Sequence, residues 1–81
     1  MRIRVKLFAI LRERAGAGEI QLDLPEGATV ASAATSLAER LPAIAAYARR
    51  AAYAVNCEYV GAEMVLKDGD ELALIPPVSG G

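Results

Sequence analysis

The residues with the most distinctive chemistry are the last six, Pro76-Pro77-Val78-Ser79-Gly80-Gly81. The two glycines have no Cβ, so the terminal carboxylate can enter a narrow enzyme channel and its carbonyl can be approached from either face. The proline pair favours an extended path and lowers the entropy lost when the segment is captured. This pattern predicts a protein whose reactive group is its own C-terminal carboxylate, on Gly81. The alternative is a frayed end of small residues.

Other residue types that commonly perform catalysis are scarce. The chain has 81 residues, no histidine and a single cysteine, Cys57. It therefore cannot form an internal disulfide, a multi-cysteine zinc or iron–sulfur site, or a histidine-based triad. No cationic cluster near Cys57 would activate its thiol, which argues against a nucleophilic role.

Two charged groups have an alternative functional interpretation. Asp68, Asp70 and Glu71 form an acidic cluster, but a metal site needs more converging ligands, so we expect a solvated turn and no bound metal. Arg12-Glu13 is expected on a short surface turn, where it makes ordinary surface ion pairs or contacts a partner.

Composition and charge exclude several classes of protein. The net charge is −1 and no basic stripe with interleaved aromatic residues occurs, which argues against a nucleic-acid partner. No apolar stretch is long enough to cross a membrane. Met1 is followed by alternating arginine and aliphatic residues rather than by a secretory signal. We expect one cytoplasmic domain.

The first third of the chain predicts a β-hairpin with a long connection. Residues 2–8 and 19–24 alternate between polar and apolar positions, as half-buried strands do. Between them, residues 9–15 resemble a short helical turn that ends at Gly16. The Pro25-Glu26-Gly27 turn then ends the second strand.

A helix and further strands follow. Thr29 is predicted to cap a helix that ends near Arg40, before Pro42. The helix has one apolar stripe, formed by Val30, Ala34, Leu37, Ala38 and Leu41. Residues 43–50 are expected to form a second short helix or turn. A strand at residues 53–56, a turn at 67–70 and a last strand at 71–75 complete the pattern.

This order of elements predicts an α+β fold. The first and last strands are both aliphatic enough to be central, and we expect them to pair in parallel. A main helix crossing a mixed four- to five-stranded sheet is the β-grasp arrangement. Residues 1–75 are then the folded domain and residues 76–81 an extended C-terminal tail. Phe8, at the end of the first strand, is predicted either to anchor an interface or to pack in the core.

Ordered motifs along nearly the whole chain resemble one protein family. They are Leu7-Phe8-Ala9 with Arg12-Glu13, Val55-Asn56, and Asp68-Gly69-Asp70-Glu71 leading to the Pro76–Gly81 tail. Together they are similar to the small, sulfur-carrier subunit of molybdopterin synthase. The resemblance implies a ubiquitin-like β-grasp fold and a protein without catalytic residues of its own.

The resemblance also implies a reaction cycle and its partners. An adenylyltransferase related to ubiquitin-activating enzymes uses ATP to adenylate Gly81, and a sulfur donor protein then yields a C-terminal thiocarboxylate. The tail enters the large subunit of a heterotetrameric synthase, where two such sulfur atoms complete the dithiolene on cyclic pyranopterin monophosphate. No cofactor is permanently bound to the carrier.

Residue by residue, the resemblance assigns two groups of positions. Gly80 and Gly81 correspond to the reactive end. Partner contacts are assigned to Phe8, Leu74, Ile75, Pro77, Val78 and Ser79. Many relatives have aromatic residues where this chain has Leu74 and Ile75. The alanine-rich segment 41–52 matches no motif.

Three alternatives to this function remain at the level of the sequence. The same carrier chemistry can serve thiamine or cysteine synthesis or transfer RNA. A ubiquitin-like modifier joined to lysines through Gly81 would have the same tail. A plain binding module with an irrelevant tail would need none of this chemistry.

Overall fold

Two central strands that run in parallel organise the sheet. They are β1 (Arg2–Leu7) and β5 (Glu71–Ile75), whose register places Val5 opposite Leu72 and Leu7 opposite Leu74. The computed structural model describes residues 1–77 of the chain. The predicted parallel pairing of the first and last strands is therefore confirmed.

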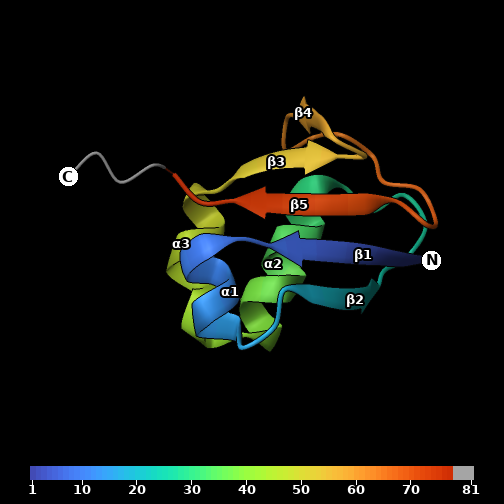
Figure 1. Cartoon of the computed structure of the whole chain (residues 1–81). Coiled ribbons are helices and arrows are strands. Elements are labelled where there is room, and N and C mark those ends of the chain that lie inside the picture. The colour runs from blue at the N-terminus through green and yellow to red at the C-terminus, as the bar shows by residue number, and fades with distance from the viewer. Residues whose placement is uncertain (78–81) are drawn as a thin grey trace.

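Three further strands flank this central pair. β2 (Glu19–Asp23) pairs antiparallel with β1, and β3 (Ala52–Val55) pairs antiparallel with both β5 and β4 (Glu58–Val60). Within residues 1–77 the strands form one mixed, five-stranded sheet in the order β2-β1-β5-β3-β4 (Figure 1). The predicted α+β β-grasp fold is confirmed.

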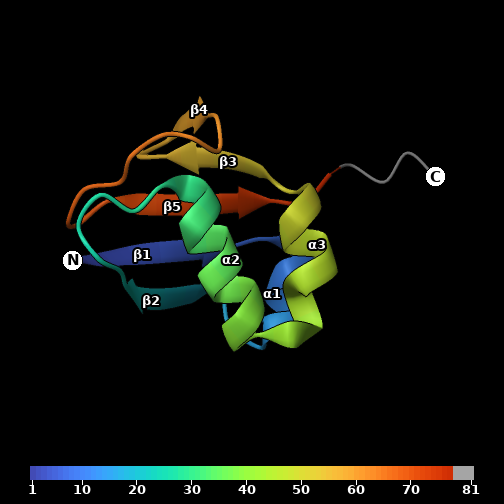
Figure 2. The same cartoon turned by 180° about the vertical axis from the view of Figure 1, so that it is seen from behind.

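The helices lie on one face of the sheet and at one of its ends. α2 (Val30–Arg40) crosses the face seen in Figure 2, while α1 (Ala9–Ala15) and α3 (Ala45–Arg50) lie at the end where β1 and β5 finish. A short 3₁₀ turn, η1 (Pro42–Ile44), joins α2 to α3. The other face of the sheet carries no helix (Figures 1 and 2) within the described part of the chain.

The core lies between the sheet and α2. Alternate residues of each central strand point to this layer, so every second side chain is buried. The side chains without measurable exposure are Ile3, Val5, Leu11, Val30, Ala33, Leu37, Ile44, Leu72 and Leu74. The predicted stripe of α2 is largely confirmed, although it omitted the buried Ala33 and included Ala38, which is only half-buried.

Thr29 begins α2 with a reciprocal cap. Its side-chain oxygen accepts a hydrogen bond from the Ser32 backbone N–H at 3.2 Å, and the Ser32 hydroxyl oxygen accepts one from the Thr29 N–H at 2.8 Å. Two backbone donors at the helix start are thereby satisfied. The predicted N-cap is confirmed, and α2 ends at Arg40, as Pro42 predicted.

The β3–β4 hairpin is the part of the sheet that sequence periodicity did not define. Asn56 and Cys57 form a two-residue turn, and both have positive φ angles, 49° and 71°. Such turns suit the twist of a hairpin, and asparagine tolerates this conformation better than most residues. β4 has three residues, too few to show an alternation along the sequence.

Asn56 also fastens this hairpin to the start of β5. Its side-chain oxygen accepts a hydrogen bond from the Glu71 N–H at 3.1 Å, and its side-chain nitrogen donates to Asp70 at 3.0 Å. Its backbone N–H donates to the Glu71 carbonyl at 2.9 Å. The Val55-Asn56 motif therefore has a structural explanation in the pairing of β3 with β5.

The acidic cluster before β5 organises the backbone. The Asp68 carboxylate accepts a hydrogen bond from the Arg2 N–H, and that of Asp70 accepts one from the Lys67 N–H, both at 2.8 Å. Among residues 1–77, no group of three or more potential ligands is placed to hold a metal ion. The carboxylates act as turn and strand-end caps.

Replacing Asn56 with glycine tests the role of its side chain. Glycine accepts the positive φ angle, so the variant loses only the two side-chain hydrogen bonds. We expect the free energy of unfolding to fall by about 1–2 kcal/mol, measured by urea denaturation. Cys57→Ala, at the next turn position, is the control and should change stability by less than about 0.5 kcal/mol. Equal losses in the two variants would contradict this assignment.

Candidate functional site

The described chain ends at the base of the predicted tail. β5 finishes at Ile75, Pro76 is half-buried and Pro77 is exposed. Val78, Ser79, Gly80 and Gly81 lie outside the described residues, so the roles assigned to them remain predictions.

Phe8 lies on the surface at the same end of the sheet. Its side chain is 46% exposed, and its extended backbone, with φ −125° and ψ 154°, joins β1 to α1. Leu7 is opposite Leu74 in the parallel pair. Phe8, directly after β1, and Ile75, the last residue of β5, therefore lie at the same end of the sheet. Ala52 pairs with Ile75 from the other side. Of the two interpretations of Phe8, the structure favours an exposed position over the core.

Leu74 does not share this surface. It is fully buried, because the alternation along β5 points it toward the helices together with Leu72. The prediction that the Leu74 side chain faces a partner is therefore wrong. Ile75, the next residue, is half-buried and points to the open face.

A row of side chains crosses the open face of the sheet. Strand register aligns Tyr59 of β4, Ala54 of β3, Ala73 of β5 and Lys6 of β1. Two alanines occupy its centre, of which Ala54 is buried and Ala73 is half-buried. We call this region the outer sheet face, formed by Lys6, Phe8, Ala54, Tyr59, Ala73 and Ile75.

Tyr59 was not among the residues singled out from the sequence. It is 75% exposed, the highest value among the large hydrophobic side chains that the structure describes as exposed. A signal for it existed, since Asn56 predicts a tight turn and a two-residue hairpin loop places Tyr59 opposite Ala54. Large exposed aromatic side chains are common anchors of protein interfaces.

Charged side chains of both signs lie along β1 on this side of the sheet, where Arg2 and Lys6 are opposite Asp23 and Glu19 of β2. The Glu71 carboxylate lies 3.6 Å from Arg4 and 3.5 Å from Lys6, so two cations share one anion. At the start of β1, the Arg2 side chain donates a 2.9 Å hydrogen bond to the Asp23 carboxylate. This hydrogen bond and the positive charge of Arg2 lower the pKa of the exposed Asp23 carboxyl. The cations of these pairs are exposed, so the pairs stabilise the fold little, but they place charges on the face that a partner can match.

The remaining predicted residues are surface features away from this row. Arg12 and Glu13 are exposed on α1, and Arg12 packs beside Gly18, where an added Cβ would lie 3.3 Å from its guanidinium. Cys57 is an exposed free thiol in the hairpin turn. Within the described residues, no helix is long and apolar enough for a membrane span.

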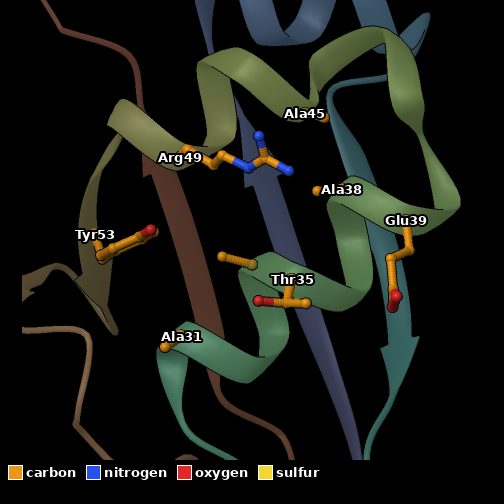
Figure 3. A pocket seen from close by; sticks show the side chains of 8 residues that line it. Ala31, Thr35, Ala38, Glu39, Ala45, Arg49 and Tyr53 are labelled. Atoms are coloured by element: carbon orange, nitrogen blue, oxygen red, sulfur yellow. The ribbon is translucent and has the colours of Figure 1, made fainter.

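A second concave region lies on the helical side. A groove of about 400 Å³ between α2 and α3 is lined by small residues and by Thr35, Glu39, Arg49 and Tyr53. Figure 3 shows Arg49 reaching from α3 across this groove toward Ala38, with Tyr53 on the β3 side. It shares no lining residue with the outer sheet face.

Comparison with known proteins decides the family. Residues 5–81 match the ThiS family, which is almost the whole chain. The chain belongs to the ThiS family. The predicted resemblance to sulfur-carrier subunits is thereby confirmed at the level of the family.

Individual relatives of this ThiS family member are similar over their full lengths. A Chlamydomonas reinhardtii protein named molybdopterin synthase sulfur carrier subunit is 40% identical and aligns over 100% of both chains. The crystal structure of SAMP1 from Haloferax volcanii is 34% identical, with a TM-score of 0.86 over 100% of both chains. A putative molybdopterin converting factor, subunit 1, from Pyrococcus furiosus is also 34% identical, with a TM-score of 0.85 over 96% of this chain and 99% of that one.

A pair of neighbouring substitutions tests the correction at Leu74. Leu74→Ala creates a cavity in the core and should lower the free energy of unfolding by about 2–5 kcal/mol. Ile75→Ala removes a half-buried side chain on the open face and should cost about 1 kcal/mol. Urea denaturation followed by circular dichroism measures both. Similar losses in the two variants would show that the assigned orientation of β5 is incorrect.

Proposed function

We propose that this chain is the sulfur-carrier subunit of a molybdopterin synthase. The full-length, 40% identical relative that bears this name carries the proposal. The fold supports it, because β5 delivers the chain end directly from the centre of the sheet to the base of the Pro76–Gly81 tail. In this proposal the Gly81 carbonyl carbon is the group that is loaded and unloaded.

Loading takes place in three steps and requires the activating enzyme and the sulfur donor. A Gly81 carboxylate oxygen attacks the α-phosphate of ATP, which releases pyrophosphate and leaves an acyl adenylate. The terminal sulfur of a protein persulfide then attacks the carbonyl carbon and expels AMP. A thiol reduces the resulting acyl disulfide, which leaves a thiocarboxylate on Gly81 and a disulfide on the donor side. A glycine terminus leaves both faces of this carbonyl open to attack.

Unloading takes place in the large subunit of the synthase. The thiocarboxylate sulfur forms a bond to a side-chain carbon of cyclic pyranopterin monophosphate as a carbon–oxygen bond of that substrate breaks and its oxygen leaves. Water then hydrolyses the thioester, which leaves the sulfur on the substrate and returns the Gly81 carboxylate. Two loaded chains supply the two sulfur atoms of the dithiolene. The tail contributes position, since holding the sulfur beside its target replaces a bimolecular encounter.

The outer sheet face is the surface on which these partners dock in the proposal. Phe8 and Ile75 lie at its tail end and Tyr59 at its β4 end. Exposed aromatic and aliphatic groups of this kind supply binding energy, while Arg4 and Lys6 orient a partner that carries acidic residues. Of the contacts assigned from the sequence, Leu74 is excluded by its burial, Phe8, Ile75 and Pro77 keep this role, and Val78 and Ser79 remain assigned to it.

Mass spectrometry of the intact chain tests the loading step. After co-expression with the activating enzyme and the sulfur donor, we expect the mass to rise by the difference between sulfur and oxygen. The chain that lacks Gly81 is the control and should remain unmodified, with an unchanged free energy of unfolding. A full-length chain that stays unmodified with both partners active would overturn the proposal.

A second candidate function is a protein modifier. The similar SAMP1 structure favours it, because that Haloferax volcanii protein is described as small archaeal modifier protein 1. In that function the Gly81 carbonyl would form an isopeptide bond with a lysine of a target. Tryptic peptides of a host proteome that carry the C-terminal residues on lysine would support it. Complementation of pathway mutants separates molybdopterin synthesis from thiamine, cysteine or transfer RNA pathways.

A further inference from the structure

A hollow at the base of the tail adjoins the proposed docking surface. It measures about 400 Å³ and is lined by Ile10 of α1, by Tyr47 and Arg50 of α3, and by Pro76 and Pro77. We call it the tail-base hollow. Its walls are apolar apart from Arg50 and the tyrosine hydroxyl, so it suits an apolar side chain better than a free anion.

The rim of the tail-base hollow is positively charged. Arg50 lines it, and the Arg14 guanidinium lies 5.9 Å from the centre of the Tyr47 ring. Both arginines are exposed. Among residues 1–77 the ion pairs involve Arg2, Arg4 and Lys6, and neither Arg14 nor Arg50 has a carboxylate within 4 Å. The two cations are thus available to an external carboxylate.

The position of the hollow decides which molecule would meet it. Pro76 and Pro77 are both its wall and the first residues after β5, so it is continuous with the tail. Phe8, at the end of β1, is followed two residues later by Ile10 in the hollow. Any protein that encloses the tail while resting on Phe8 and Ile75 therefore reaches the rim of the hollow.

We propose that the tail-base hollow binds a segment of the large subunit that presents an apolar side chain next to a carboxylate. This inference rests on the proposed function and adds a second contact to it. The apolar side chain fills the space between Ile10, Tyr47 and Pro77, and the carboxylate pairs with Arg50 and Arg14. The large subunit then holds the base of the tail from the helical end as well as from the outer sheet face.

Adjacent arginines on α3 provide a matched test. Arg50→Glu reverses a charge in the tail-base hollow, whereas Arg49→Glu makes the same change one residue earlier, in the groove between α2 and α3 (Figure 3). Both positions are exposed in the last turn of α3. We expect Arg50→Glu to lower the affinity for the large subunit about tenfold or more. The affinity of this variant should also depend less on salt concentration than that of the unaltered chain. Arg49→Glu should remain within about twofold of the unaltered chain.

A second pair of chains excludes an effect on the protein's own tail. Removing Ser79, Gly80 and Gly81 should weaken binding to the large subunit. Arg50→Glu should lower the affinity of this shortened chain by the same factor as it lowers the affinity of the full chain. Ile10→Ser tests the apolar part and should weaken binding by about threefold or more while the salt dependence is kept. Isothermal titration calorimetry or surface plasmon resonance gives these values, with circular dichroism as a check of folding.

The outcomes separate this inference from the proposed function. Equal effects of Arg50→Glu and Arg49→Glu, or loss of the Arg50 effect in the shortened chain, would overturn the inference alone. Failure of the unaltered chain to bind the large subunit would overturn the proposed function and the inference with it.

Discussion

The parallel pairing of the first strand with the last is the constraint on which the rest of the molecule depends. Val5, Leu7, Leu72 and Leu74 are buried along this pair, with exposures of at most 2%, and they form the centre of the core. Parallel neighbours cannot be joined by a tight turn, so the rest of the domain must form the connection between them. The pairing also makes both strands finish at one end of the sheet. Phe8 and the tail therefore lie together although they are far apart in the sequence.

A second consequence is the difference between the two faces of the sheet. α2 covers one face and buries the large aliphatic side chains, while the other face has alanines at its centre and charged or aromatic groups around them. A small domain leaves a large share of its surface exposed. A surface that combines exposed Phe8 and Tyr59 with charged side chains is suited to a protein partner. The fold thus separates the surface that maintains stability from the surface that is available for binding.

Periodicity and turn chemistry predicted most of the fold. Residues 2–8 and 19–24 alternate clearly because one face of each strand is buried, and the apolar run at residues 72–75 indicated a buried strand. Thr29 and Pro42 bound α2 by local hydrogen bonding and sterics. β4 escaped prediction because three residues held by a hairpin turn carry almost no periodic signal. Leu74 was misplaced because the resemblance assigned the pair with Ile75 as a unit, whereas a strand sends neighbouring side chains to opposite faces. The tail-base hollow was beyond sequence reasoning, since it unites residues of α1, α3 and the chain end that only the folded structure brings together.

The central claim is that the sulfur is carried by the Gly81 carbonyl and transferred without further help from the loading enzymes. A chain prepared by semisynthesis with a thiocarboxylate at Gly81 tests this most directly, mixed with the large subunit and cyclic pyranopterin monophosphate in the absence of ATP, activating enzyme and sulfur donor. The account predicts that the dithiolene product forms and that two loaded chains are consumed for each dithiolene, while the same chain with an ordinary carboxylate yields none. No product from the thiocarboxylate chain, or equal product from both chains, would contradict it.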